Sequence, residues 1–169
     1  MSRWGIFAAA ALACIALSSA RAQDSSLSAQ ANAAYLAANA QKPGVATRPS
    51  GLQYRILHNG FGKQPGPFDS VEAYYKGTLI NGTVFDQTEP GMPANFVVNK
   101  LIPGWTEALE IMREGDHWEL VIPANLAYGT RGAGGVIPPN QTLVFDLELL
   151  KVTPAPPPDK NQDQGQSQQ

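Results

Sequence analysis

Six aromatic side chains could together line one binding pocket. Each is expected at a strand end, at a helix start or in a loop, and their segments contain no plausible nucleophile, metal-ligand cluster or phosphate-binding loop. A concave site built from so many rings binds apolar groups. Any catalysis here would therefore be non-covalent and would depend on the environment inside the pocket. The six rings are those of Tyr75, Phe85, Phe96, Trp105, Tyr128 and Phe145.

Short motifs surround these rings in a distinctive order. They read Tyr75-Lys-Gly-Thr, Asn81-Gly-Thr-Val-Phe85-Asp86, Leu101-Ile-Pro-Gly-Trp105, Leu126-Ala-Tyr128-Gly, and Val136-Ile-Pro-Pro139 with Leu143-Val-Phe145-Asp146. This string resembles the FK506-binding-protein (FKBP) type of peptidyl-prolyl cis–trans isomerase over about residues 50–152. The preceding lead-in, from residue 37 to residue 54, is similar to that of exported bacterial members of this family.

The resemblance implies a catalytic set of four residues. The backbone N–H of Ile102 and the hydroxyl of Tyr128 would each contact a substrate carbonyl. Asp86 would accept a hydrogen bond from the Tyr75 hydroxyl and would present a negative edge to a substrate carbonyl.

The resemblance also implies which residues bind the substrate. Trp105 would be the pocket floor, and large macrocyclic inhibitors such as FK506 are implied as possible ligands. Two positions depart from the best-known members: Ala94 lies where they carry an aromatic wall, and Ala133 where some carry histidine, which leaves macrolide affinity open. The other binding residues would be the walls Phe85, Phe96 and Phe145, the mouth residue Leu101, and Val136 and Ile137, which would cover the bound chain.

Rotation about an X–Pro bond is a reaction that suits such a pocket. The two isomers differ by only about 0.5–1 kcal/mol, but amide resonance imposes a barrier of roughly 18–20 kcal/mol. Twisting breaks the resonance and reduces charge separation, so removing water favours the twisted state. No acid, base, nucleophile, cofactor or metal is required. His58 and His117 are isolated and have no ligand partners at metal-binding spacing.

The segments between the motifs predict a sheet. Asn81-Gly82 between two apolar runs predicts a hairpin, because both residues tolerate positive φ. Trp118 matches no pocket position and is expected in the core. Alternating apolar residues or short apolar runs indicate strands over residues 52–56, 71–75, 96–98, 118–122 and 143–149.

One helix is expected beside this sheet. Trp105, Ala108, Leu109 and Met112 have the i, i+3, i+4, i+7 spacing of a helix packed on one side, and Pro103-Gly104 begins it. Strands with a single amphipathic helix indicate an α+β fold. The resemblance makes this a twisted antiparallel β-sheet wrapped around one short α-helix. The long loop over residues 124–140 is expected to be functional.

The first residues have the layout of a secretory signal peptide over residues 1–22. Arg3 supplies the charged start, residues 6–17 are apolar, and Ala20-Arg-Ala22 is an A-x-A cleavage pattern. The apolar run is shorter than the about 20 residues of a transmembrane helix, so no stable membrane span is expected after cleavage. A retained anchor and lipidation at Cys14 remain alternatives. Cys14 is the only cysteine, so the mature chain would have neither a disulfide nor a thiolate.

Three further segments would follow the signal peptide. Alanine-rich residues within 23–46 predict a short N-terminal helix that stops before Pro43-Gly44. The isomerase domain would cover residues 47–153, and the Pro- and Gln-rich residues 154–169 predict a disordered tail. The formal net charge of −2, without clusters of Lys and Arg, argues against nucleic-acid binding.

We therefore expect a peptidyl-prolyl cis–trans isomerase that acts on unfolded or partly folded proline-containing polypeptides. We expect it to be exported, in a bacterial periplasm. The alternative is a chaperone or binding module that holds extended proline-containing segments, with incidental isomerase activity. The intact polar rim favours the isomerase. The sequence leaves open the client proteins, the residue preferred before proline, and whether the chain is a monomer or a weak dimer.

Overall fold

The computed structural model describes residues 25–156 of the 169-residue chain. The predicted signal peptide over residues 1–22 lies outside the described residues, as does most of the predicted tail. The described part contains helices α1 (Ala29–Asn39) and α2 (Pro103–Leu109). Its strands are β1 (Val45–Thr47), β2 (Gln53–His58), β3 (Ser70–Leu79), β4 (Val84–Gln87), β5 (Ala94–Val97), β6 (His117–Ile122) and β7 (Leu143–Thr153).

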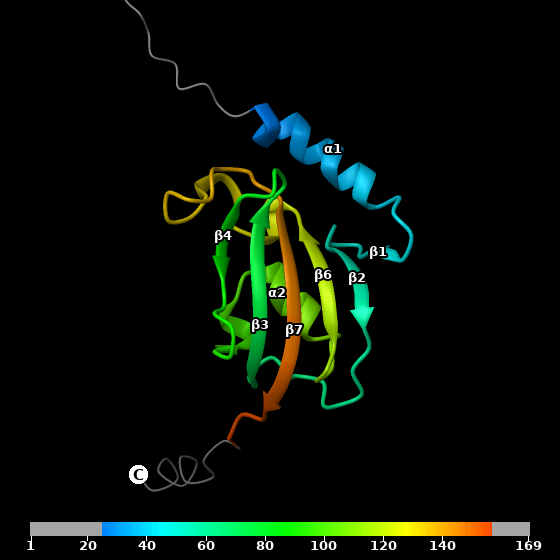
Figure 1. The fold of residues 1–169 in the computed structure, drawn as a ribbon, viewed down its shortest axis with the longest axis vertical. Coiled ribbons are helices and arrows are strands. Elements are labelled where there is room, and N and C mark those ends of the chain that lie inside the picture. The colour runs from blue at the N-terminus through cyan, green and yellow to red at the C-terminus, as the bar shows by residue number, and fades with distance from the viewer. Residues whose placement is uncertain (1–24, 157–169) are drawn as a thin grey trace, which may run out of the picture.

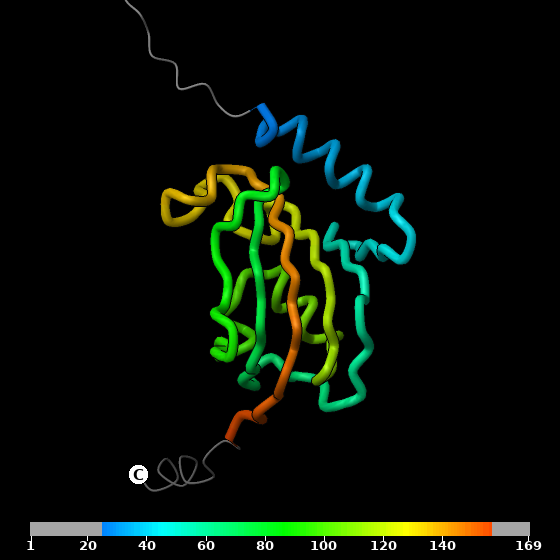
Figure 2. The backbone as a smooth tube through the Cα atoms, viewed as in Figure 1, coloured from blue at the N-terminus to red at the C-terminus, as the bar shows by residue number. Residues whose placement is uncertain are grey.

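All of these strands pair antiparallel in one sheet, in the order β1-β2-β6-β7-β3-β4, and β5 also pairs with β3. The two longest strands, β3 and β7, form the centre. The sheet is twisted, α2 lies against one of its faces, and α1 lies beyond one end of the strands (Figures 1 and 2). This confirms the predicted α+β class: a twisted antiparallel sheet around one short helix, preceded by an N-terminal helix.

Helix α2 is the main support of the hydrophobic core on its face of the sheet. Trp105, Ala108 and Leu109 are buried, as the predicted stripe requires. The regular helix ends at Leu109, yet Met112 in the turn that follows is also fully buried. The apolar stripe therefore predicted the burial of Met112 correctly, although this residue lies after the end of the helix.

The hairpin predicted at Asn81-Gly82 joins β3 to β4. Leu79 N–H donates to the Thr83 carbonyl at 2.9 Å, and Gly82 N–H donates to the Leu79 carbonyl at 2.9 Å. Gly82 has a φ of 86°, whereas Asn81 is not among the described residues with positive φ. The Asn81 side chain instead accepts the Thr83 N–H at 3.0 Å. The turn therefore uses one left-handed residue and one side-chain hydrogen bond.

Strand β2 differs from its prediction. Leu52 is buried and Tyr54 is half-buried, but Ile56 is 42% exposed although the alternation placed it on the core face. The pairing of β2 with β6 shifts register between Ile56 and His58. Ile56 itself still pairs in register with Trp118, so it lies on the predicted face, and its exposure shows that the core does not cover that part of the face.

The predicted N-terminal helix is present as α1, preceded by a 3₁₀ turn at Ser25–Leu27. Ser28 caps it, because its hydroxyl oxygen accepts the Ala31 N–H at 3.1 Å. Neither this helix nor any other in the described part of the chain is long and apolar enough to cross a membrane.

We predict that Gly104→Ala destabilises the fold. A Cβ at this position would lie 2.4 Å from Ile122 Cγ2, so α2 must move away from β6. Overpacking of this kind costs about 1–3 kcal/mol, measurable as a lower free energy of unfolding in urea. Gly66→Ala is the matched control, since its Cβ would approach no atom closer than 3.4 Å. Equal stability of the two variants would contradict the packing argument.

Candidate active site

A pocket of about 480 Å³ opens beside α2, between the β3–β4 hairpin, β5, β7 and the loop that carries Tyr128. It brings together all the predicted site residues except Val136 and Ile137. Lys100 and Pro103 also line the pocket, although the sequence did not lead us to predict them. They could have been found because Lys100 directly precedes the Leu101–Trp105 motif and Pro103 lies within it. The lining consists of Tyr75, Phe85, Asp86, Phe96, Lys100, Leu101, Ile102, Pro103, Trp105, Tyr128 and Phe145.

Trp105 is at the centre of the aromatic cluster. Its ring centroid lies 5.3 Å from that of Tyr75, 5.5 Å from Phe96 and 5.2 Å from Phe145. The interplanar angles of these pairs are 86°, 78° and 82°, the edge-to-face geometry that aromatic quadrupoles favour. Because Trp105 and Phe145 are each only 4% exposed, the floor of the pocket is also part of the core.

The absence of a side chain at Gly77 makes room for this cluster. A Cβ there would lie 2.5 Å from Phe85 Cζ and 2.9 Å from Phe145 Cε1. Phe85 and Phe145 pack edge to face above it, with centroids 5.6 Å apart. A steric requirement therefore explains the glycine in the Tyr75-Lys-Gly-Thr motif. Only a residue without a side chain lets the Phe85 and Phe145 rings lie against β3.

The polar rim contains a short hydrogen bond between two predicted catalytic residues. The Tyr75 hydroxyl donates to Asp86 Oδ2 at 2.6 Å. Burial raises the pKa of the Tyr75 phenol well above its ordinary value, and the hydrogen-bonded Asp86 carboxylate raises it further. The phenol is therefore neutral and cannot act as a base at physiological pH.

Two further polar groups lie at the mouth of the pocket. Ile102 precedes α2 in an extended conformation, and its carbonyl accepts the N–H groups of Trp105 and Thr106. Among the residues described here, no acceptor pairs with the Ile102 N–H, so it is available to a ligand. Tyr128 is 40% exposed and is close enough to Tyr75 to contribute to that phenol's raised pKa.

Val136 and Ile137 do not line the pocket. Val136 is 58% exposed, whereas Ile137 is 6% exposed and belongs to the core cluster. The loop folds back on itself here, because Ala133 and Ile137 exchange backbone hydrogen bonds at 3.0 and 2.9 Å. A covering role for these two residues stays a prediction, and for Ile137 it would require the loop to open.

Within residues 25–156, no group of three or more His, Cys, Asp or Glu side chains is arranged to hold a metal ion. His117 instead pairs with Asp146, with Nε2 and Oδ1 2.7 Å apart. Neither residue lines the aromatic pocket. The predicted core position of Trp118 agrees with its 4% exposure.

Comparison with protein families gives two matches along this chain. Residues 62–150 match the family described as FKBP-type peptidyl-prolyl cis-trans isomerase. Residues 8–56 match the family described as the domain amino terminal to FKBP-type peptidyl-prolyl isomerase. The first match contains every residue of the aromatic pocket, and the second contains α1.

Curated relatives support the same relationship. The chain is 54% identical to the outer membrane protein MIP of Legionella longbeachae over 123 residues, which are 72% of this chain and 53% of that protein. It is also 54% identical to the FKBP-type 22 kDa peptidyl-prolyl cis-trans isomerase of Escherichia coli K12 over 119 residues, 70% of this chain and 58% of the relative. The chain thus spans a little more than half the length of these relatives.

Solved structures show the same fold. FkpA from Escherichia coli aligns with a TM-score of 0.71 at 47% identity, covering 76% of this chain and 62% of that one. A peptidyl-prolyl cis-trans isomerase from Pseudomonas syringae aligns with a TM-score of 0.70 at 39% identity, covering 74% of this chain and 92% of the other.

We predict that Tyr75 stays protonated at pH 10, where a free tyrosine is about half ionised. Its stabilising contribution is fully present below that pH and is lost only as the pH rises through the higher folded-state pKa. Phenolate absorbance of the native protein, minus that of Tyr75→Phe, should therefore show no ionisation near pH 10. The same difference measured in urea is the control and should titrate at the ordinary value. A native difference that also titrates there would contradict the burial argument.

Proposed function

We propose that this chain, which belongs to the family of FKBP-type peptidyl-prolyl cis-trans isomerases, accelerates rotation about X–Pro bonds in unfolded or partly folded polypeptides. The observation that carries this proposal is the aromatic pocket. Its floor is the buried Trp105 ring, and its rim carries the Tyr75–Asp86 pair and the unpaired Ile102 N–H. An apolar cavity with a few oriented polar groups suits a proline ring flanked by amides.

Catalysis would follow from how the pocket solvates the imide bond. The planar imide is more dipolar than the twisted one, so water stabilises the ground state more than the transition state. Bringing the bond against Trp105 and its neighbouring rings replaces that water with an apolar wall. The twisted state is then favoured without any covalent step, and the relevant quantity is the difference in binding between the two states.

The polar rim would fix the orientation of the bound chain. The Ile102 N–H and the Tyr128 hydroxyl would donate hydrogen bonds to carbonyls that flank the proline. The Asp86 carboxylate would lie near the carbonyl oxygen of the rotating bond, which is more negative in the planar state. Repulsion would therefore raise the energy of the planar state more than that of the twisted state.

We further propose that the protein is exported and works in a bacterial periplasm on folding proteins. The signal-peptide layout of residues 1–22 and the bacterial relatives support this. The isomerase domain would cover residues 47–153. FK506-type macrolides would enter the same pocket, although Ala94 and Ala133 provide less rim contact than an aromatic ring and an imidazole would.

We predict that Asp86→Ala lowers kcat/KM about tenfold, a loss of ~1.4 kcal/mol of transition-state stabilisation. The expected cause is loss of the charge at the rim, since Asp86 is exposed and its removal leaves the core intact. The measurement is isomerisation of a proline-containing tetrapeptide, together with proline-limited refolding of a model protein.

Asp146→Ala is the matched control for this experiment. Its carboxylate is 58% exposed and pairs with His117 rather than with a pocket residue. Equal acceleration by wild type and both variants would reject the catalytic role of Asp86. A wild-type protein that binds the peptide without accelerating it would favour the alternative, a binding module for extended proline-containing segments.

A further inference from the structure

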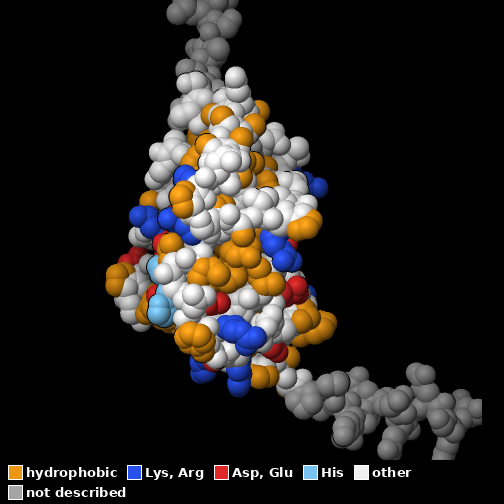
Figure 3. Space-filling view, turned by 90° about the vertical axis from the view of Figure 1, so that its right-hand side faces the viewer, with side chains coloured by type: hydrophobic (Ala, Val, Ile, Leu, Met, Phe, Trp, Pro, Cys, Tyr) orange, Lys and Arg blue, Asp and Glu red, His pale blue; other side chains and the backbone are white. Residues whose placement is uncertain are grey.

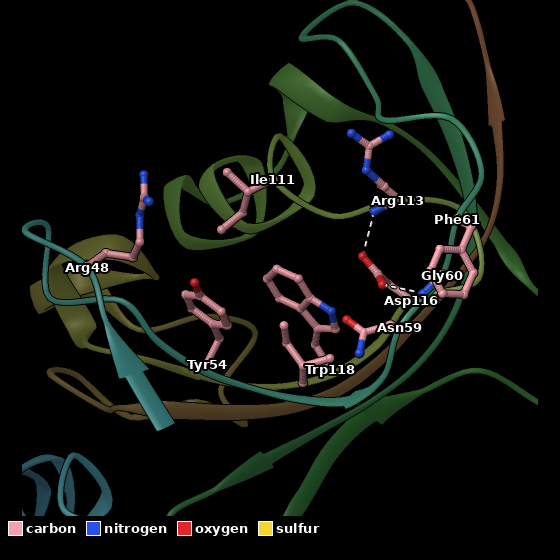
Figure 4. A pocket seen from close by; sticks show the side chains of 10 residues that line it. Arg48, Tyr54, Asn59, Gly60, Phe61, Ile111, Arg113, Asp116 and Trp118 are labelled. Carbon is pink, nitrogen blue, oxygen red and sulfur yellow. Dashed lines mark hydrogen bonds between the residues drawn. The ribbon is translucent and has the colours of Figure 1, made fainter. Parts of the chain in front are cut away.

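A second cleft, of about 580 Å³, lies on the β2–β6 side of α2. We call it the Trp118 cleft. No residue of the aromatic pocket contributes to it, because Trp105 and its neighbouring rings lie toward β3 and β4. Figure 4 shows the lining residues: Arg48, Tyr54, Ile56, Asn59, Gly60, Phe61, Ile111, Arg113, Asp116 and Trp118.

Two stacked rings form the apolar part of the cleft. Tyr54 on β2 and Trp118 on β6 have ring centroids 4.6 Å apart and an interplanar angle of 12°. Ile111 faces them from the turn after α2, as Figure 4 shows. Trp118 is only 4% exposed, so the accessible apolar surface here belongs mainly to the half-buried Tyr54 and Ile111, with Trp118 packed behind Tyr54.

Guanidinium groups lie toward the two ends of the cleft (Figure 4). Arg48 is partly neutralised, since its Nε lies 3.1 Å from Glu107 Oε1. The Arg113 guanidinium reaches only the Gly62 carbonyl, at 3.4 Å, and no described carboxylate lies within ion-pair distance of it.

The carboxylate inside the cleft is engaged by the backbone and not by the Arg113 guanidinium. Asp116 is 4% exposed, and its two oxygens accept the backbone N–H groups of Gly60 and Arg113, both at 2.6 Å. These bonds hold the loop after β2 in place. The group that faces a ligand at this end of the cleft is therefore the exposed Arg113 guanidinium, whose N–H donors are accessible, while the buried Asp116 carboxylate offsets part of its charge.

The rim of the cleft exposes apolar side chains to solvent. Phe61 is 92% exposed and Ile56 is 42% exposed. Figure 3, which views the side of the molecule that carries β1 and β2, shows hydrophobic side chains gathered there with both basic and acidic side chains around them. Tyr, Trp and Arg are the residue types that dominate the energetics of protein interfaces.

We propose that the Trp118 cleft binds a second segment of the client polypeptide, an extended stretch in which an apolar residue is flanked by Asp or Glu. The apolar side chain would lie against Tyr54, Ile111 and Phe61, and the carboxylate would pair with Arg113. The occupant is argued from charge complementarity and from the aromatic lining. That the bound segment belongs to a client of the isomerase depends on the proposed function. That the cleft binds such a segment does not.

The test uses the full chain and two fluorescent peptides without proline, one with leucine flanked by glutamates and one with leucine flanked by lysines. Wild type should bind the glutamate peptide more tightly, and added salt should weaken that binding. Phe61→Ala and Arg113→Gln should each weaken it about fivefold or more. Phe68→Ala is the matched control, since Phe68 is 68% exposed but lies outside the cleft, and it should bind like wild type.

The rate of tetrapeptide isomerisation should be unchanged in all three variants. The acceleration of proline-limited refolding of an acidic protein should fall in Phe61→Ala and Arg113→Gln but not in Phe68→Ala. Equal binding of both peptides, or unchanged binding in the Phe61 and Arg113 variants, would overturn the cleft proposal. A wild-type protein that does not accelerate tetrapeptide isomerisation would instead reject the proposed function. The peptide-binding measurements would then still test the cleft proposal by themselves.

A separate set of buried hydrogen bonds joins α1 to the loop that carries Tyr128. The Asn32 side chain on α1 is 5% exposed. Its Nδ2 donates to Gln141 Oε1 at 3.1 Å, and its Oδ1 accepts the Thr142 N–H at 2.7 Å. Gln141 and Thr142 are the last residues of the loop before β7, so one amide on α1 holds the loop's end.

The hydrogen bonds continue from that end toward the aromatic pocket. Gln141 Nε2 donates to the Pro139 carbonyl at 3.0 Å. Asn140 has a φ of 60°, a left-handed conformation, and its N–H donates to the Gly129 carbonyl at 2.8 Å. Gly129 directly follows Tyr128, so a continuous route of short contacts runs from Asn32 to the Tyr128 backbone.

We infer that Asn32 is a positioning residue that fixes the Tyr128 hydroxyl at the mouth of the pocket. This inference depends on the proposed function. Asn39 provides the matched control, because it is 2% exposed and also anchors α1, but through Gln53 on β2 at 2.9 Å. It makes no hydrogen bond to the loop.

The test is a double-mutant cycle on tetrapeptide isomerisation. Asn32→Ala should lower kcat/KM about threefold in the wild-type background and have no further effect in Tyr128→Phe. Asn39→Ala should leave kcat/KM unchanged, and Asn32→Asp, which keeps the acceptor for Thr142, should restore part of the rate. Additive effects of Asn32→Ala and Tyr128→Phe, or equal effects of the two asparagine variants, would overturn the inference. An inactive wild type would reject the proposed function itself.

Discussion

The Trp105 ring belongs at once to the hydrophobic core and to the floor of the aromatic pocket. It is 4% exposed, packs edge to face against three other rings, and leaves its Nε1 without a hydrogen-bond partner among the described residues. A buried donor without a partner costs free energy. The fold tolerates that cost at the position where an apolar surface is needed, and the close packing of Gly104 on β6 holds the ring there.

A pocket that acts by desolvation must be dry at its floor and polar at its rim. The structure separates these requirements by element. Rings from β3, β4, β5, β7 and α2 form the floor and walls, while the rim groups are Asp86 at the exposed side of β4 and the Ile102 N–H and Tyr128 from segments outside the strands. Loop residues such as Tyr128 then depend on contacts outside the pocket for their position, and the Asn32 amide provides such contacts from another helix.

Local signals predicted local structure well. Asn81-Gly82 gave the hairpin, and the spacing of Trp105, Ala108 and Leu109 gave the buried face of α2. Strand order could not be predicted, because the pairing of β3 with β7 joins segments that are distant in sequence. Ile56 pairs in register with Trp118 and lies on the predicted face, but it borders an open cleft that no periodicity reveals. The alternation therefore predicted the face of Ile56 correctly, whereas its exposure depends on what covers that face.

The position of β7 in the sheet has a consequence for how the pocket forms. This last strand lies between β6 and β3, where Leu147 is paired with both Trp118 and Tyr75, and its Phe145 ring completes the pocket. Every other residue that lines the pocket precedes this strand in the sequence. Neither the sheet centre nor the aromatic pocket can therefore be complete until this strand has paired on both sides, so formation of the pocket is coupled to closure of the whole sheet.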